Sequence, residues 1–219
     1  MDSRAGADPA PERNPSPSTI ATPGKLRLLV EVVYRNLPNI VSMLGVVILS
    51  VLFLDDGFRY FIPVVILNNV MDDLDGILAR GLHLSSAFGA RLDNVCDAVS
   101  HILISMAVGI HFGGVVLAFS LVASVAILVR VVQRLAPSPV SGIGSPTSEL
   151  MRHLLLVVIL YETFSFEVAP VLAVVFAVNS VSMLVPFPLP YMVRSMAKSL
   201  LAVVGVNVLL LGQIRQQHL

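Results

Sequence analysis

Charged residues are scarce in this chain. Asp, Glu, Lys and Arg together make up 13% of its 219 residues, while 56% are hydrophobic and the mean hydropathy is +0.86. A soluble domain has about a quarter of its residues charged. The composition therefore excludes an ordinary soluble enzyme and predicts a polytopic helical membrane protein. The formal net charge is zero, and we expect no nucleic-acid partner.

The chain also has only one cysteine, and its first residues lack the features of a signal peptide. The single cysteine, Cys96, excludes an intramolecular disulfide. It lies between Asp93 and Asp97, but a lone thiol among oxygen ligands suits neither magnesium nor calcium, so we interpret it as a packing residue. Residues 1–24 hold five prolines and lack the apolar core of a signal peptide. We expect them to form a disordered tail before one membrane domain, residues 25–219.

Apolar runs of spanning length predict an all-α transmembrane bundle of six or seven helices. We expect these helices at 36–54, 60–82, 87–111, 113–133, 147–163, 167–185 and 195–213. The last run decides between six and seven spans. Residues 25–35 alternate basic and apolar groups, which predicts either a short amphipathic helix at the membrane surface or the first turns of the next span.

Basic residues cluster at alternate helix ends, and they predict the orientation. They are Lys25, Arg27, Arg35, Arg80, Arg91, Arg130, Arg134, Arg152, Arg194 and Lys198. The side rich in Lys and Arg is expected in the cytoplasm, here that of a bacterial inner membrane. Arg130 and Arg134, one turn apart, either anchor that side or bind an acidic group of a substrate.

Four carboxylates lie in the apolar stretch between residues 72 and 97. They are Asp72, Asp75, Asp93 and Asp97. Acids within membrane segments are costly and usually functional. Helical spacing puts the first two on one face of one helix and the last two on one face of the next. At 1.5 Å per residue, each pair lies roughly 10 Å from the cytoplasmic end of its helix. The four carboxylates are therefore expected to converge.

Such a cluster predicts a divalent metal site. Hard carboxylate oxygens select Mg²⁺, Mn²⁺ or Ca²⁺, and two ions could clamp both sides of a phosphoryl displacement. Asp97, the deepest acid, is either a second-metal ligand or a base on an attacking hydroxyl. Gly76 and Gly89 leave room for a phosphate or sugar, and Arg80 can pair with a phosphate.

Two alternatives remain open from the residues alone. The acids could serve structural ion pairs, for example Asp72 with Arg80 or Asp93 with Arg91, although this accounts for one pair and not for four acids on two faces. They could also form the ion path of a cation transporter, but the sequence shows no second copy of the acid pattern, as the repeats of many transporters would require.

The acids belong to a longer pattern, Asp-x2-Asp-Gly-x2-Ala-Arg-x8-Gly-x3-Asp-x3-Asp. It is complete here as Asp72, Asp75, Gly76, Ala79, Arg80, Gly89, Asp93 and Asp97. This pattern resembles the signature of the class I CDP-alcohol phosphatidyltransferases. Pro38, Asn39 and Ser42 are similar to the Pro-Asn-x2-Thr/Ser motif on the first helix of that family. The resemblance extends from residue 25 to the end of the chain.

The resemblance implies an enzyme that moves a phosphatidyl group from CDP-diacylglycerol to an alcohol and releases CMP. It implies that the four aspartates hold two Mg²⁺ or Mn²⁺ ions and that Asp97, as the base, and Asp93 are catalytic. It also implies a nucleotide pocket lined by Asn39, Ser42, Gly76, Ala79, Arg80 and Gly89. The resemblance is compatible with a homodimer.

Four phrases bear on the acceptor alcohol. Ser86, Phe88 and Gly89 resemble the serine-accepting members, whereas the proline and lysine of the glycerol-phosphate members are missing. Ala98 stands where inositol-phosphate members often have arginine. Cys96 fits the Asp-x-x-Cys-Asp phrase of choline and ethanolamine members. The resemblance is loosely closest to the CDP-diacylglycerol–serine O-phosphatidyltransferases, and the other three acceptor classes stay open.

Overall fold

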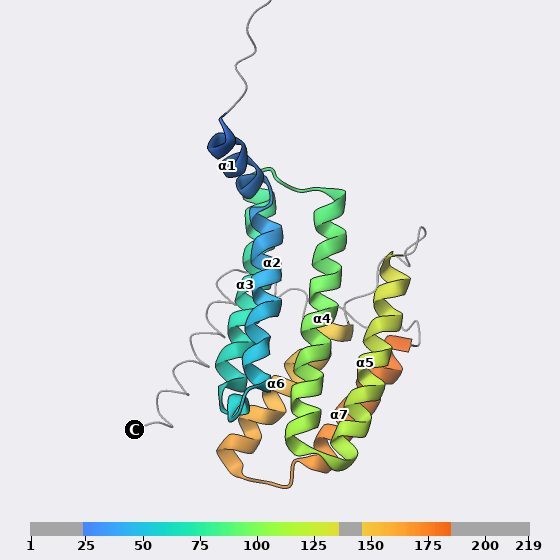
Figure 1. Ribbon diagram of the computed structural model, residues 1–219. Coiled ribbons are helices and arrows are strands. Elements are labelled where there is room, and N and C mark those ends of the chain that lie inside the picture. The colour runs from blue at the N-terminus through green and yellow to red at the C-terminus, as the bar shows by residue number, and fades with distance from the viewer. Residues whose placement is uncertain (1–23, 136–145, 185–219) are drawn as a thin grey trace, which may run out of the picture. The chain divides into compact units, whose positions relative to one another are not determined.

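A computed structural model describes residues 24–135 and 146–184, which form helices and no strand (Figure 1). The elements are α1 (Lys25–Arg35), α2 (Leu37–Ile48), the 3₁₀ helices η1 (Leu49–Phe53) and η2 (Gly57–Tyr60), α3 (Phe61–Gly81), α4 (Ala87–Phe112), α5 (Gly114–Leu135), α6 (Pro146–Phe164) and α7 (Ala169–Leu184). The all-α prediction is confirmed. The expected helix at 195–213 and residues 1–23 of the expected tail lie outside the described residues.

The predicted helix bounds agree closely with the observed ones. The run predicted at 36–54 is α2 continued by η1, and the others differ by one or two residues at their ends. Pro38 lies in the first turn of α2, where a residue without an amide hydrogen is tolerated. The segment 25–35 forms a helix of its own, α1, and all of this helix except Arg35 belongs to a first compact unit that ends at Tyr34.

Among the described residues, two helices are long and apolar enough to cross a membrane. They are α4 and α5, and a third is added if α1 and α2–η1 count together as one span. The larger predicted number is not reached because α3 carries the acidic cluster and α7 has 16 residues. The outer face of α5 fits a lipid environment, since Val125 and Val132 are 61% and 70% exposed.

The helices α4 and α5 form a tight antiparallel hairpin (Figure 1). Gly113 and Gly114 join them with φ angles of +65° and +48°, a region that favours glycine. A Cβ atom on Gly109 would lie 2.0 Å from the Ser120 hydroxyl oxygen. The two backbones therefore approach closely near this turn, which fixes the axial register of the hairpin.

The remaining helices pack around this hairpin. The helix α2 contacts α3 and α4, and α7 contacts α5 and α6. Fully buried apolar side chains from several helices form the core, including Phe61, Ile104, Ile127, Leu154 and Phe176.

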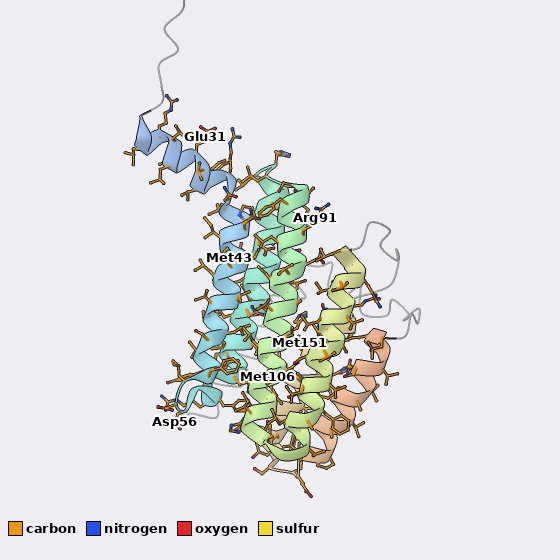
Figure 2. The ribbon with its side chains drawn as sticks, turned by 45° about the vertical axis from the view of Figure 1, so that its right-hand side comes forward. Glu31, Met43, Asp56, Arg91, Met106 and Met151 are labelled. Carbon is orange, nitrogen blue, oxygen red and sulfur yellow. The ribbon has the colours of Figure 1, made fainter. Side chains whose placement is uncertain are left out.

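The two ends of the bundle differ in character. Arg91 near the start of α4 and Asp56 before η2 lie at opposite ends (Figure 2). A cavity of about 1490 Å³ at the Asp56 end is lined by residues that include His111 and Glu162. None of the four aspartates of the predicted metal site lines this cavity. The predicted metal site therefore lies outside this cavity.

Candidate metal centre

Three of the predicted carboxylates meet in the structure. Asp72 and Asp75 project from α3 and Asp93 from α4, and one oxygen atom of each lies within 4.8 Å of the others. Oxygen ligands bind Mg²⁺ or Ca²⁺ at about 2.0–2.6 Å, so ligands of one ion lie within about 5 Å of each other by the same distances. The three oxygens therefore lie close enough together to share a divalent ion.

The fourth acid adjoins this trio. The carboxyl group of Asp97 lies beside that of Asp72, close enough to interact with it by hydrogen bonding. Asp97 is half-buried, as is Asp93, while Asp72 is exposed. The expected convergence of four carboxylates is observed as a group of three, with Asp97 next to Asp72.

The ion-pair alternative is not realised in the described part of the chain. None of the four aspartates forms a salt bridge there with Arg80 or Arg91, although Arg152 pairs with Glu149 at 2.6 Å. Four neighbouring acids without a salt bridge in this part of the chain repel one another, since like charges at short distance disfavour ionisation of both. A bound divalent cation would remove this repulsion.

A buried hydroxyl orients one of the acids. Asp75 is only 5% exposed, and the Ser42 hydroxyl of α2 donates a hydrogen bond to its carboxylate. The same hydroxyl oxygen lies 3.2 Å from the Pro38 carbonyl. The resemblance implies that Ser42 lines the nucleotide pocket, which stays a prediction; in the structure its hydroxyl contacts Asp75 and so positions a candidate metal ligand.

Two glycines keep space open beside the acids. A Cβ atom on Gly89 would lie 3.2 Å from the side-chain oxygen of Asn39, and one on Gly76 would lie 3.1 Å from the Arg80 guanidinium. Asn39 of α2 therefore faces the start of α4, and the Arg80 side chain folds back over Gly76. Both glycines therefore contact polar side chains that the resemblance assigns to the nucleotide pocket.

The remaining predicted pocket residue contributes through its backbone. The Ala79 carbonyl accepts hydrogen bonds from the Leu84 amide at 2.9 Å and the Ser85 hydroxyl at 3.1 Å. At the other side of this connection, Ser86 caps α4 by accepting a hydrogen bond from the Gly89 amide at 2.9 Å. These bonds hold the short α3–α4 connection and thereby fix the register between the two acid pairs.

Comparison with known proteins identifies this arrangement. The family model of CDP-alcohol phosphatidyltransferase matches residues 35–185, well over half of the chain and all of the elements described above except most of α1. The chain belongs to the CDP-alcohol phosphatidyltransferase family. An uncharacterized protein of Aquifex aeolicus (strain VF5) is 32% identical over 96 residues, which cover 39% of this chain and 48% of that protein. The match thus spans about half the length of that relative. No solved structure matches the chain.

Membership makes this chain one of a family of phosphotransferases and agrees with the resemblance of its acid pattern. Divalent metals serve this family, and the cluster of Asp72, Asp75 and Asp93 supplies the hard oxygen ligands that such an ion prefers.

Sequence reasoning missed two polar groups near the candidate metal centre. His101 lies on α4 one turn beyond Asp97, is 9% exposed, and its Nδ1 atom has no hydrogen-bond partner among the described residues. Ser105, a further turn on, is fully buried, and its hydroxyl has no partner in the same part of the chain. The signal was available, because Asp93, Asp97, His101 and Ser105 continue one i, i+4 stripe. The sequence left the roles of Arg130 and Arg134 open. Of these two residues, Arg134 acts electrostatically on Asp93 and Asp97.

Proposed function

We propose that this chain is an integral-membrane enzyme that transfers a phosphatidyl group from CDP-diacylglycerol to a small polar alcohol and releases CMP, with serine the favoured acceptor. The observation that carries the proposal is the meeting of three carboxylate oxygens within 4.8 Å at the junction of α3 and α4. The match to the CDP-alcohol phosphatidyltransferase family supports the CDP-linked donor.

The four aspartates would hold two Mg²⁺ or Mn²⁺ ions, which supply Lewis-acid stabilisation of the charge on the diphosphate. Ser42 keeps Asp75 in its ligating orientation through the buried hydrogen bond. Arg80 and Asn39 would hold the phosphate and nucleotide groups in the space that Gly76 and Gly89 leave open. The ligands and the pocket thus come from three helices that pack on one another.

Asp97 would act as the base. Its carboxylate would take the proton from the acceptor hydroxyl as that oxygen attacks the lipid-side phosphorus. The bond between this phosphorus and the bridging oxygen of CMP breaks, and CMP leaves with the electron pair. The products are CMP and a phospholipid whose headgroup is the acceptor, so all atoms are accounted for. Asp93, one turn before Asp97, would hold the ion on the donor side.

The chain would work in a bacterial inner membrane with its site at the cytoplasmic face. Support comes from the two helices of spanning character and from Arg80 and Arg91, which flank the α3–α4 connection beside the acids. We extend the two or three spans to a bundle of six or seven, because α2–η1, α3, α6 and α7 pack around the same hairpin. A homodimer is one assembly of this chain that remains to be tested.

The test is an assay of CMP release by the purified full-length protein with CDP-diacylglycerol, Mn²⁺ or Mg²⁺, and a panel of alcohols. We expect CMP release with at least one alcohol, and a loss of about 10²–10⁴-fold in kcat for Asp97→Asn because a general base is removed. The matched control is Asp73→Asn, which removes an exposed acid next to the cluster and should keep activity. Metal-dependent ion flux without CMP release would instead favour the transporter.

A further inference from the structure

The cavity at the Asp56 end has a mixed lining that the proposed reaction does not use. Part of its wall is apolar and buried, since Phe61, Ala107 and Val158 are at most 2% exposed. Another part is apolar and exposed, since Leu54 and Ile110 are 66% and 55% exposed. The titratable side chains of the lining are those of Asp56, Arg59, Tyr60, His111 and Glu162. The cavity therefore offers apolar surface and both signs of charge to one ligand.

Stacked rings hold the polar part of this wall in place. The imidazole of His111 lies parallel to the Phe58 ring, with the ring centroids 3.7 Å apart, and Phe112 packs edge-on against both. The ring of Tyr161 on α6 packs in turn against Phe112. Glu162, the next residue on α6, acts electrostatically on His111. Packed rings from η2, α4 and α6 thus bring the polar groups of three elements to one cavity.

The charges show what kind of ligand fits. Among the described residues, Arg59, Asp56 and Glu162 form no salt bridge, and the Arg59 guanidinium donates a hydrogen bond to the neutral Tyr60 hydroxyl. A purely anionic ligand would be attracted by Arg59 and repelled by the two acids, and a purely cationic ligand would meet the opposite pattern. A ligand that carries one cationic and one anionic group can pair with all three.

The cavity lies where a lipid headgroup would lie. The helix α4 ends at Phe112 and α5 begins at Gly114, so the two helices of spanning character turn at this end of the bundle. Tyr60, 42% exposed in the cavity wall, is of a residue type that is enriched at membrane–water interfaces. Asp72 follows Phe61 on α3 by eleven residues, which is about 16 Å along the helix. A headgroup in the cavity is therefore out of reach of the acid cluster.

We propose that this cavity binds a zwitterionic phospholipid of the surrounding membrane, with the lipid phosphate at Arg59 and the lipid ammonium group at Asp56 and Glu162. A guanidinium pairs with two phosphate oxygens at once, and the exposed apolar wall faces an acyl chain. The volume of about 1490 Å³ exceeds the roughly 300–1,000 Å³ of ordinary small-molecule pockets, which leaves room for part of that chain beside the headgroup. The inference goes beyond the proposed function, because this lipid is a bound ligand and not a reactant.

The test measures lipid binding to the full-length protein in detergent by native mass spectrometry. The probes are phosphatidylethanolamine, phosphatidylglycerol and diacylglycerol with the same acyl chains, so that they differ only in being zwitterionic, anionic or without a phosphate. We expect one bound phosphatidylethanolamine with a Kd about tenfold or more below that of the other two, because each of those lacks at least one ionic contact. Equal affinity for all three lipids, or a preference for phosphatidylglycerol, would overturn the inference.

Variants then assign the bound lipid to this cavity. Arg59→Gln and Glu162→Gln should each raise the Kd for phosphatidylethanolamine about tenfold, since a charge-assisted contact is lost. Arg59→Lys should lie between, because it keeps the charge without the fork. The matched controls are Asp55→Asn and Glu167→Gln, which remove exposed acids near the same cavity that do not line it and should keep the wild-type Kd. An equal loss of affinity in the controls would assign the effect to overall charge and contradict the proposal.

A second readout separates this cavity from the donor site. Arg59→Gln and Glu162→Gln should keep the KM for CDP-diacylglycerol within about twofold of wild type, because the cavity lies away from the acid cluster. A wild-type Kd for phosphatidylethanolamine in both variants, with displacement of the bound lipid by CDP-diacylglycerol, would assign that lipid to the donor site and overturn the inference. Absence of CMP release by the wild-type protein would remove the proposed function but leave the binding test unchanged.

Discussion

Replacing Ser42 by alanine tests whether the acidic cluster is a metal site. The Ser42 hydroxyl donates a hydrogen bond to Asp75, and both residues are at least nine-tenths buried. A hydrogen bond to a charged group contributes about 1.5–3 kcal/mol, which corresponds to roughly 10–150-fold in an equilibrium constant. Loss of such an outer partner typically weakens metal affinity about 10–100-fold. We therefore expect Ser42→Ala to need about 10–100 times more Mn²⁺ for half-maximal activity.

The assay is a titration of CMP release against Mn²⁺ at saturating CDP-diacylglycerol and acceptor. At saturating metal, kcat should recover to within about threefold of wild type, because Asp75 itself remains in place. Ser42→Thr keeps the hydroxyl and should restore the metal requirement. Ser180→Ala is the matched control, since it removes a buried helix hydroxyl that bonds the Phe176 carbonyl at 2.7 Å. A wild-type Mn²⁺ requirement in Ser42→Ala would refute the reasoning.

Three further outcomes can be measured. Gly89→Ala would bring a methyl group to 3.1 Å from Ser86 Oγ and 3.2 Å from Asn39 Oδ1, and should raise KM for CDP-diacylglycerol about tenfold through misplacement of the donor; an unchanged donor KM would exclude Gly89 from that pocket. Gly109→Ala would collide with Ser120 and should lower the thermal unfolding midpoint, at a cost of about 1–3 kcal/mol; combining it with Ser120→Gly should restore most of the loss. Chelation with EDTA should abolish CMP release and added Mn²⁺ or Mg²⁺ restore it, whereas activity in EDTA would speak against a metal centre.

Local pattern was sufficient to predict the helices and the faces of the acids. Apolar runs bounded by Gly113 and by Asp56 and Gly57 gave helix ends to within a few residues, because a turn with positive φ can be read from residue type. Helical periodicity predicted that Asp72 and Asp75 share one helix face and that Asp93 and Asp97 share another, because residues three or four apart lie on the same face. The length of the predicted spans was less informative, since a helix that carries catalytic acids loses the apolar character by which spans are recognised.

Contacts between helices could not be read from the sequence. Periodicity gives the face of each helix but no axial offset, so it could not show that three oxygens meet while Asp97 adjoins Asp72. That offset depends on the bonds around Ala79 and Ser86 in the α3–α4 connection. The position of Ser42 behind Asp75 depends in turn on how α2 packs on α3, which no spacing within α2 reveals.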